Sequence, residues 1–246
     1  MKLLLYFTSI AVSILTPAIC TAQSPTPRTA LSYFSKLRDG DLVFIKSSTS
    51  RAEPIEKLTR SPLTHCGIIF LDGNGKPVVY EGAGRNEPRY ATVEKWQIDE
   101  STKKGAASPD SPLHAVYARR LKTPLTKVEL DDLKKRAAEL HATKYDHAFQ
   151  LGNKEPGSNK PYVYCSELIY EAFQKIGRKV GEPRPFRYYY KQPDLTEKQV
   201  KELMDPLLDK ESAQELRTPK GKYNPDEAVI SPEDVYISEL LQDVTD

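Results

Sequence analysis

The chain has 246 residues, of which 28% are charged, 39% hydrophobic and 9% aromatic. This composition is typical of a globular protein and unlike that of a disordered or membrane-embedded chain, and the length fits one large domain or two small ones. The chain has 36 basic and 34 acidic residues, so its formal charge is only +2, which gives no electrostatic attraction towards nucleic acid. We therefore expect no nucleic-acid partner.

The first 22 residues have the layout of a secretory signal peptide. Lys2 precedes an apolar run from Leu3 to Leu15, and small residues follow at Cys20-Thr21-Ala22. The run is too short to span a bilayer, so no integral membrane segment is expected after its removal. The pattern predicts cleavage after Ala22 and an exported protein in the periplasm or cell envelope.

Two alternatives to that interpretation are a lipoprotein site at Cys20 and a buried N-terminal helix. Ile19 is bulky where lipoprotein signals have a small residue, and the stretch is apolar all round rather than amphipathic. Residues 23–36, which include the Ser/Thr/Pro-rich segment from Ser24 to Thr29, are interpreted as a tether. Residues 37–246 are then expected to form a single domain.

The first half of this domain is expected to be mainly strands. Residues 42–45 form a short apolar run typical of a buried strand, and residues 51–59 suit a short surface helix. Residues 64–71 and 76–81 flank the turn sequence Asp72-Gly73-Asn74-Gly75, which predicts a hairpin inside a covered sheet. Another strand is predicted over 113–121, after a polar loop at 99–111.

The second half is expected to be mainly helical. Thr126 and Glu129 form a capping-box pattern for a helix ending near Thr143, and a helix over 162–173 has Cys165 near its N-terminus. A further helix is predicted from Thr196 to about residue 208. Residues 183–193 are predicted to be a loop, and the acidic segment 226–246 a solvated tail.

Cys165 is the strongest candidate for a nucleophile. A thiol at a helix N-terminus ionises more easily, because the free backbone N–H groups and the helix dipole favour the thiolate. A small buried cysteine also packs well in a core, so this placement needs a histidine base beside it to indicate catalysis.

Four histidines are available as that base. His141 is expected at a helix end and His114 on a strand, where surface and structural roles are ordinary, and His147 in a loop is held in reserve. His65 is preferred because it enters a strand and because a carboxylate, Glu81, lies across the predicted hairpin. Glu81 stands opposite His65 if Leu71 pairs with Gly75, whereas Gly82 stands there if Leu71 pairs with Lys76.

Removal of the signal leaves only two cysteines, Cys66 and Cys165, which raises the alternative of a disulfide. Strand alternation places Cys66 on the sheet face opposite His65. If His65 points towards Cys165, the two sulfurs are then expected to lie apart, which argues against a disulfide and against a metal held by His65, Cys66 and Cys165. We expect no metal and no cofactor.

Four segments together resemble a known family: GDLVF at 40–44, THCGII at 64–69, VYEG at 79–82 and YCSEL at 164–168. They are similar to the YiiX/YebB-like proteins, circularly permuted papain-like relatives of the NlpC cell-wall peptidases. The resemblance extends from about Leu37 to the segment 229–235. It implies an α+β fold, with an antiparallel sheet or partial barrel packed against helices.

The resemblance also implies roles for individual residues. Cys165 is the expected nucleophile, His65 the base and acid, and Glu81 the group that orients the imidazole. The nearest match to an oxyanion-stabilising tyrosine is Tyr145. Where similar proteins often have valine this chain has Cys66, which we expect to be exchangeable without effect on the site.

Three functions remain open on this evidence. The first is an exported cysteine hydrolase that cleaves an amide bond in a cell-wall peptide or a small amino-acid amide through an acyl-thioester. The second keeps the triad but acts on lipid acyl groups as a thioesterase, amidase or acyltransferase, because the aromatic residues in 186–190 are suited to wall an apolar pocket or else pack as a loop. The third is a binding module of the same fold without turnover.

Overall fold

The computed structural model describes residues 34–82, 89–102, 113–141, 143–147, 149–154, 157, 159–191, 194–205 and 224–244. The predicted signal peptide and nearly all of the tether lie outside these residues. The fold is α+β: in the described part of the chain a six-stranded antiparallel sheet packs against helices and does not close into a barrel. A two-stranded ribbon accompanies it.

The main sheet has the strand order β4-β3-β2-β1-β5-β8, so β1 and β2 lie at its centre. Its strands are β1 (Leu42–Ile45), β2 (His65–Leu71), β3 (Pro77–Glu81), β4 (Arg89–Thr92), β5 (Val116–Leu121) and β8 (Leu241–Asp243). The ribbon pairs β6 (Arg184–Pro185) with β7 (Ala228–Val229). The central strands are buried on both faces, which explains their nearly continuous apolar sequences.

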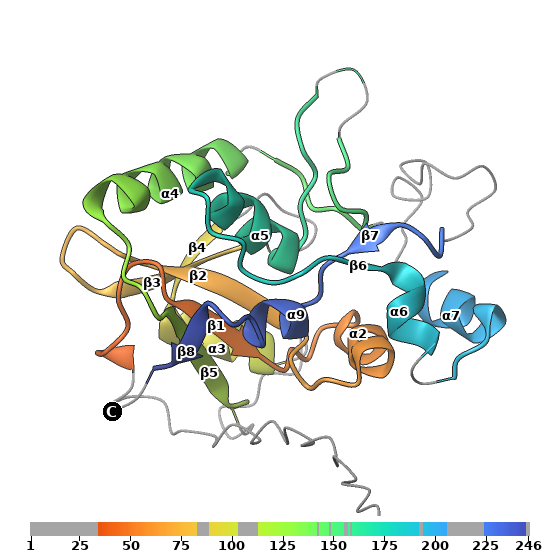
Figure 1. Cartoon of the computed structure of the whole chain (residues 1–246). Helices are drawn as coiled ribbons and strands as arrows, with labels where there is room; N and C mark the ends of the chain where they lie inside the picture. Colours follow the sequence, from red (N-terminus) through yellow and green to blue (C-terminus); the bar gives the residue numbers. More distant parts are fainter. Residues whose placement is uncertain are drawn as a thin grey trace, which may run out of the picture.

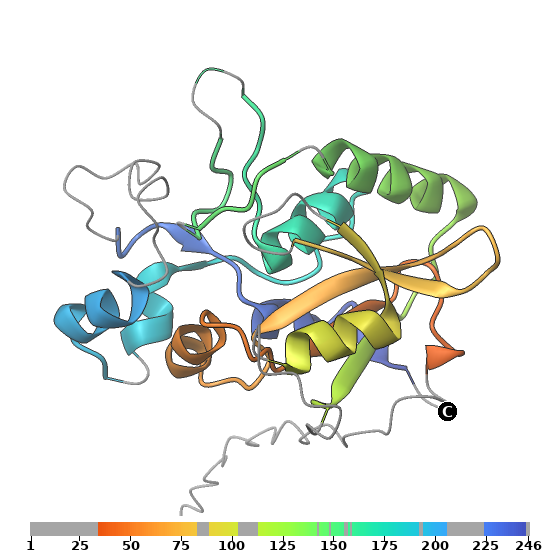
Figure 2. The same cartoon turned by 180° about the vertical axis from the view of Figure 1, so that it is seen from behind.

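Helices cover both faces of the sheet (Figures 1 and 2). On one face lie α4 (Lys127–Leu140) and α5 (Cys165–Lys175), and on the other lies α3 (Val93–Ser101). The side chains sort accordingly, because Phe44 and Ile68 join the core below α5 whereas Ile69 and Val79 join the core around Trp96 of α3. The next residue along each strand points to the opposite face, so the two cores share one sheet.

A second group of helices lies to one side of the sheet, at the right in Figure 1. It consists of α2 (Ala52–Thr59), α6 (Phe186–Lys191) and α7 (Glu197–Met204), and α2 packs against both of the others. The short helix α9 (Pro232–Tyr236) packs against α5. None of the helices in the described ranges has the length and apolar character that a membrane span requires.

Local sequence signals explain where several helices begin. The side chains of Thr126 and Thr196 each accept a hydrogen bond from the backbone N–H of the residue three positions on. The side chains of those residues, Glu129 and Gln199, in turn accept a hydrogen bond from the backbone N–H of the threonine, so both predicted capping boxes are confirmed. Helix α5 ends before Gly177, whose φ of 76° is of the left-handed kind that glycine favours.

Three predictions of irregular structure are wrong. Residues 99–101, expected in a loop, complete α3, which begins at a Thr92 cap. The stretch 183–193, read as a loop because of its prolines, contains β6 and α6. The expected solvated tail contributes β7, α9 and β8 to the fold, because Ile230, Val235 and Leu241 have buried partners that a local reading of acidic residues does not reveal.

The hairpin is confirmed, but neither predicted register is correct. Leu71 pairs with Pro77, because the turn contains three residues between Asp72 and Lys76. Gly75 takes a φ of 75°, and one carboxylate oxygen of Asp72 accepts hydrogen bonds from the backbone of Asn74 and Lys76. Since Ile68 pairs with Tyr80, Glu81 follows opposite Gly67 and shares its face with His65, one diagonal step away.

Candidate active site

Cys165 is the first residue of α5 and lies where that helix meets the sheet. Its thiol is buried, with only 2% of the residue exposed. The backbone comes close to the end of β3 here, since a Cβ added to Gly82 would lie 3.6 Å from the Cys165 nitrogen. The placement at a helix N-terminus predicted from the sequence is therefore confirmed, and no side chain caps the N–H groups of the first turn.

His65 and Glu81 are in direct contact. The imidazole Nε2 hydrogen bonds to Oε2 of Glu81, and Glu81 is fully buried. The missing side chain of Gly67 leaves room for this diagonal contact, because a Cβ at that position would lie 3.5 Å from the Cβ of Glu81 and 2.5 Å from a methyl group of Val79. With Nε2 occupied, Nδ1 is the ring nitrogen left to interact with Cys165, which is among the groups that raise the pKa of His65.

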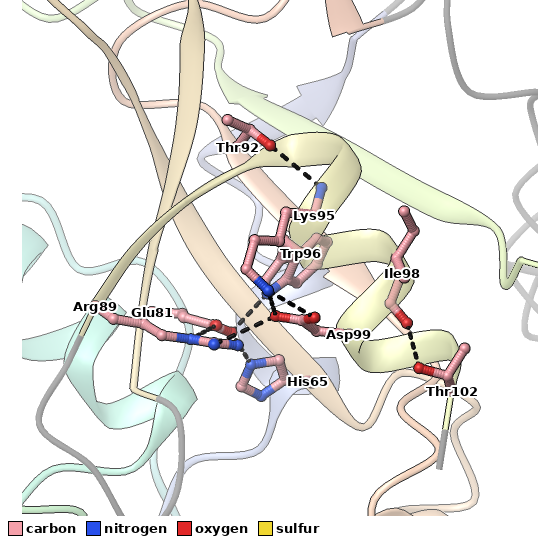
Figure 3. A network of polar contacts seen from close by, with 9 residues as sticks. All are labelled: His65, Glu81, Arg89, Thr92, Lys95, Trp96, Ile98, Asp99 and Thr102. Atoms are coloured by element: carbon pink, nitrogen blue, oxygen red, sulfur yellow. Dashed lines mark hydrogen bonds and ion pairs between the residues drawn. The ribbon is translucent and has the colours of Figure 1, made fainter. Parts of the chain in front are cut away.

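Two further residues hold Glu81 in place (Figure 3). Trp96 donates its indole N–H to Oε2 at 2.6 Å, and Arg89 donates Nε–H to Oε1 at 2.8 Å. Arg89 also forms an ion pair with Asp99 at 3.3 Å. Both oxygens of Glu81 are therefore engaged, which fixes the orientation of the carboxylate that faces His65.

Glu100 is a second carboxylate beside the imidazole. It lies on α3 four positions after Trp96, so both side chains face the same side of the helix. One ligand atom from each of His65, Glu81 and Glu100 can be chosen so that all three lie within 4.8 Å of one another, and all three residues are buried. This is the group of acidic and imidazole side chains among the described residues that has the spacing of a metal site.

The charges in this site favour a thiolate and an imidazolium. Burial alone lowers the pKa of His65, but the negative charges of Glu100, Cys165 and Glu81 outweigh burial and raise that pKa well above its ordinary value. The pKa of Cys165 is held well below its ordinary value by a hydrogen bond from Cys66 and by the charge and hydrogen bond of His65, against the opposing effect of burial. The pKa of Glu81 is also lowered, because His65 and Arg89 outweigh its burial.

The predicted separation of Cys66 from Cys165 is wrong. Cys66 does point away from the face of His65, but α5 covers the face to which Cys66 points, and the two thiols lie close enough for each to shift the pKa of the other. His65 pairs with Ile45, the last residue of β1, so it lies at the end of the sheet, where its ring can reach the sulfur from the other face. Both cysteines are free thiols in this structure.

Tyr145 lies near the site but is not part of the hydrogen-bonded group. Its ring is buried between His147 and Phe149, with the guanidinium of Arg51 at 4.7 Å from the ring centroid. Burial is the main cause that raises the pKa of Tyr145, and the charge of Cys165 adds to it, so the phenol keeps its proton. A protonated hydroxyl beside a thiolate is compatible with the oxyanion role that the resemblance implies.

Sequence reasoning missed Cys66, Arg89, Trp96 and Glu100. A Thr92 cap followed by Trp96 and Glu100 at helical spacing is the signal that would have indicated α3 and its polar face. The other histidines do not take the place of His65: His141 follows the end of α4, and His114 contacts the backbone oxygen of Lys46. His147, the reserve candidate, packs its ring against that of Tyr145.

A thiol at a helix start, joined to an imidazole from a strand that precedes it in the chain, on a sheet covered by helices, defines a permuted papain-like protein. The family model described as permuted papain-like amidase enzyme, YaeF/YiiX, C92 family, matches residues 36–245. The chain belongs to this family.

Two relatives support the same assignment. The uncharacterised protein YiiX of Escherichia coli strain K12 is 25% identical over 207 residues, which are 83% of this chain and 84% of that protein. A crystal structure described as metalloprotein yiiX, from Escherichia coli O157:H7, superposes with a TM-score of 0.60 at 23% identity. The superposed region covers 85% of this chain and 97% of that structure, which shows that the two share a fold.

Proposed function

We propose that this protein hydrolyses an amide bond, with Cys165 as nucleophile, His65 as acid and base, and Glu81 as the group that orients the imidazole. The observation that carries the proposal is the buried ring of His65, which is hydrogen bonded to Glu81 and lies close enough to Cys165 for each to shift the pKa of the other. Membership in a family of permuted papain-like amidases supports the same reaction class.

The reaction follows from these positions. The Cys165 thiolate attacks the carbonyl carbon, and the imidazolium of His65 gives its proton to the nitrogen as the C–N bond breaks, which leaves an acyl-thioester and a free amine. A water molecule then gives one proton to His65 while its oxygen attacks the thioester, so that the acid is released and the thiolate restored. The backbone N–H at the start of α5 and the hydroxyl of Tyr145 are the groups we assign to the oxyanion.

The test compares single variants on small amide substrates. Cys165→Ala should reduce hydrolysis to background, and His65→Gln should reduce kcat by about a hundredfold or more. His141→Gln, at the exposed end of α4, is the matched control and should retain full activity. Undiminished hydrolysis by folded Cys165→Ala protein would contradict the proposal.

The binding-module alternative is separated by the reactivity of the thiol. A catalytic Cys165 ionises below the ordinary thiol pKa, as the surrounding charges favour, and is alkylated rapidly at neutral pH. A slow reaction with the midpoint of an ordinary thiol, measured with iodoacetamide across pH, would instead favour a protein that binds without turnover.

The metal described for the E. coli yiiX structure does not fit the arrangement in this chain. The three groups that have the necessary spacing are His65, Glu81 and Glu100. Glu81, however, accepts hydrogen bonds from three donors, and Arg89 brings a positive charge to the same carboxylate. These contacts would have to be given up to a cation. We expect treatment with EDTA to leave amide hydrolysis unchanged, and a loss that zinc restores would overturn this expectation.

A further inference from the structure

Two buried thiols meet where α5 begins. Cys66 lies on β2 and Cys165 is the first residue of α5, and both belong to the same hydrophobic core. Both are free thiols. The proposed amide hydrolysis uses only Cys165 as a nucleophile, which leaves the second thiol without a covalent role.

The strand register places Cys66 beside the start of α5. Ile68 pairs with Tyr80. Two residues further along the same antiparallel register, Gly82 stands opposite Cys66. Residues directly opposite each other point to the same face of the sheet, with their Cβ atoms about 5 Å apart. A side chain at position 82 would therefore lie next to that of Cys66, on the face that α5 covers.

The backbone of Cys165 occupies the place of that missing side chain. A Cβ added to Gly82 would lie 3.6 Å from the backbone nitrogen of Cys165 and 3.7 Å from its Cα. The Cα atoms of disulfide-bonded cysteines are usually about 4.4–6.8 Å apart, so this close approach suits a direct bond between the two sulfurs. The mutual pKa shifts of Cys66 and Cys165 agree with such proximity.

The two thiols differ in their access to solvent and in their charge. Cys165 lines a cavity that is partly open to solvent, whereas Cys66 is fully buried and is not among the lining residues. The surroundings lower the pKa of Cys165, and burial raises the pKa of Cys66. Because peroxides oxidise the thiolate, Cys165 is the sulfur that a small peroxide reaches and oxidises first.

We propose that Cys165 and Cys66 form a redox pair, in which a peroxide oxidises Cys165 and Cys66 then closes a disulfide with it. The pair is a site of reversible modification and depends on the placement of the two sulfurs, not on the substrate. Its effect on activity rests on the proposed amide hydrolysis.

Both steps balance with hydrogen peroxide as the oxidant. The Cys165 thiolate attacks one peroxide oxygen, the O–O bond breaks, and the departing hydroxide takes the proton of the His65 imidazolium to become water. The sulfur of Cys66 then attacks the resulting sulfenic acid, the S–O bond breaks, and the second hydroxide leaves as water with the thiol proton of Cys66. The two sulfurs together lose two electrons, which reduce one peroxide to two water molecules.

The disulfide would both stop and protect the nucleophile. Amide hydrolysis ends while the Cys165 sulfur is bonded, and it resumes once a dithiol reduces the bond. A sulfenic acid that is not captured by a second thiol is oxidised further to a sulfinic acid, which dithiols do not reverse. We therefore expect a reversible loss of activity when Cys66 is present and an irreversible loss when it is absent.

The first test follows the two sulfurs by mass spectrometry. The full chain is reduced, freed of reductant, treated with a slight excess of hydrogen peroxide and alkylated with iodoacetamide under denaturing conditions. We expect monomeric protein whose tryptic peptides containing Cys66 and Cys165 are linked, and dithiothreitol should separate them. A Cys165 that is unchanged, converted to sulfinic acid, or bonded to a second molecule would overturn the inference.

The second test removes the thiol that closes the bond. After peroxide treatment, Cys66→Ser should carry sulfinic acid at Cys165 and regain less than about a tenth of its own starting activity with dithiothreitol, whereas the unchanged protein should regain nearly all of its activity. Cys66→Ala, which adds no polar group to the core, should behave like Cys66→Ser. Ile68→Val is the matched control, because Ile68 joins the same core from the same strand, and it should recover like the unchanged protein. Full recovery by both Cys66 variants would overturn the role of Cys66.

The mass measurement separates failure of this inference from failure of the proposed function, because it needs no substrate. If the disulfide forms but no amide is hydrolysed, the proposed function is wrong and the redox pair stands. If Cys165-dependent hydrolysis is found but no disulfide forms, the redox pair is wrong and the proposed function stands.

Discussion

Glu100 places a second negative charge beside the imidazole of His65, in addition to that of Glu81. The groups that face His65 are Glu100, Cys165 and Glu81, and all three raise its pKa against the effect of burial. In the proposed mechanism the rate falls on the alkaline side as the imidazolium loses its proton, so a raised pKa extends activity to higher pH.

Glu100→Gln should therefore move the alkaline limb of the kcat/KM profile to lower pH and leave the acid limb in place. The charge is removed while the shape of the side chain is kept. The measurement is a pH profile on one amide substrate, with Glu94→Gln at an exposed position of α3 as control. An unchanged alkaline limb would show that Glu100 does not act on His65.

Cys66 is the other residue whose effect differs from expectation. Its thiol donates to the Cys165 sulfur, and this hydrogen bond is the largest of the causes that lower the pKa of Cys165. We had expected valine at position 66 to leave the site unchanged. We now predict that it alters the pKa of Cys165.

Cys66→Val should raise the pKa of Cys165, because the thiolate loses a donor, and the midpoint of alkylation by iodoacetamide should move to higher pH. Cys66→Ser keeps a hydrogen-bond donor of similar size, so the pKa of Cys165 should rise less in this variant than in Cys66→Val. Equal midpoints for the unchanged protein and Cys66→Val would contradict this assignment.

At the scale of elements, the last strand completes the sheet. β8 pairs with β5, and Leu241 is buried in the core while its neighbour Leu240 is 39% exposed. The two leucines differ in burial and not in chemistry, so they form a matched pair.

Leu241→Ala should lower the free energy of unfolding by about 2–5 kcal/mol, because it leaves a cavity under the sheet edge. Leu240→Ala should change it by less than about 0.5 kcal/mol. Urea unfolding followed by circular dichroism provides the measurement, and equal losses for the two variants would show that β8 is not docked as described.

At the scale of the whole molecule, export remains a proposal that rests on residues 1–22. The physical pattern is a basic start, an apolar run and a small-residue end. Substrates in the cell envelope, whether peptides or lipids, would then be within reach of the enzyme.

Expression of the full chain in a bacterial host should yield a mature protein that begins at Gln23. Mass spectrometry of the periplasmic and membrane fractions measures this directly, with Cys20→Ser as the control for lipid attachment. A protein that begins at Cys20 and carries the mass of a lipid would contradict cleavage after Ala22.

The central strands and the capped helices were predictable because their signals are local. The run at 42–45 is apolar at every position, and Thr126 with Glu129 fixes the start of α4 within one turn. The same holds for Cys165 at the start of α5. Sequence patterns of this length depend on neighbouring residues alone, so no tertiary knowledge is needed to interpret them.

The elements at the end of the chain were not predictable in this way. β8 and α9 are stabilised by residues far away in the sequence, such as the strand partner Leu121. The register of the hairpin was missed for a related reason, since it depends on how many residues the turn takes up at Gly75.

The sequence by itself determined which three residues were proposed as the catalytic group, Cys165, His65 and Glu81, because their residue types and local positions already favour that chemistry. Only the tertiary structure decided which groups tune them: Glu100 and Trp96 reach the site from the far face of the sheet, and Cys66 meets Cys165 beneath α5. Contacts between distant segments depend on how whole elements pack, and no local pattern encodes that packing.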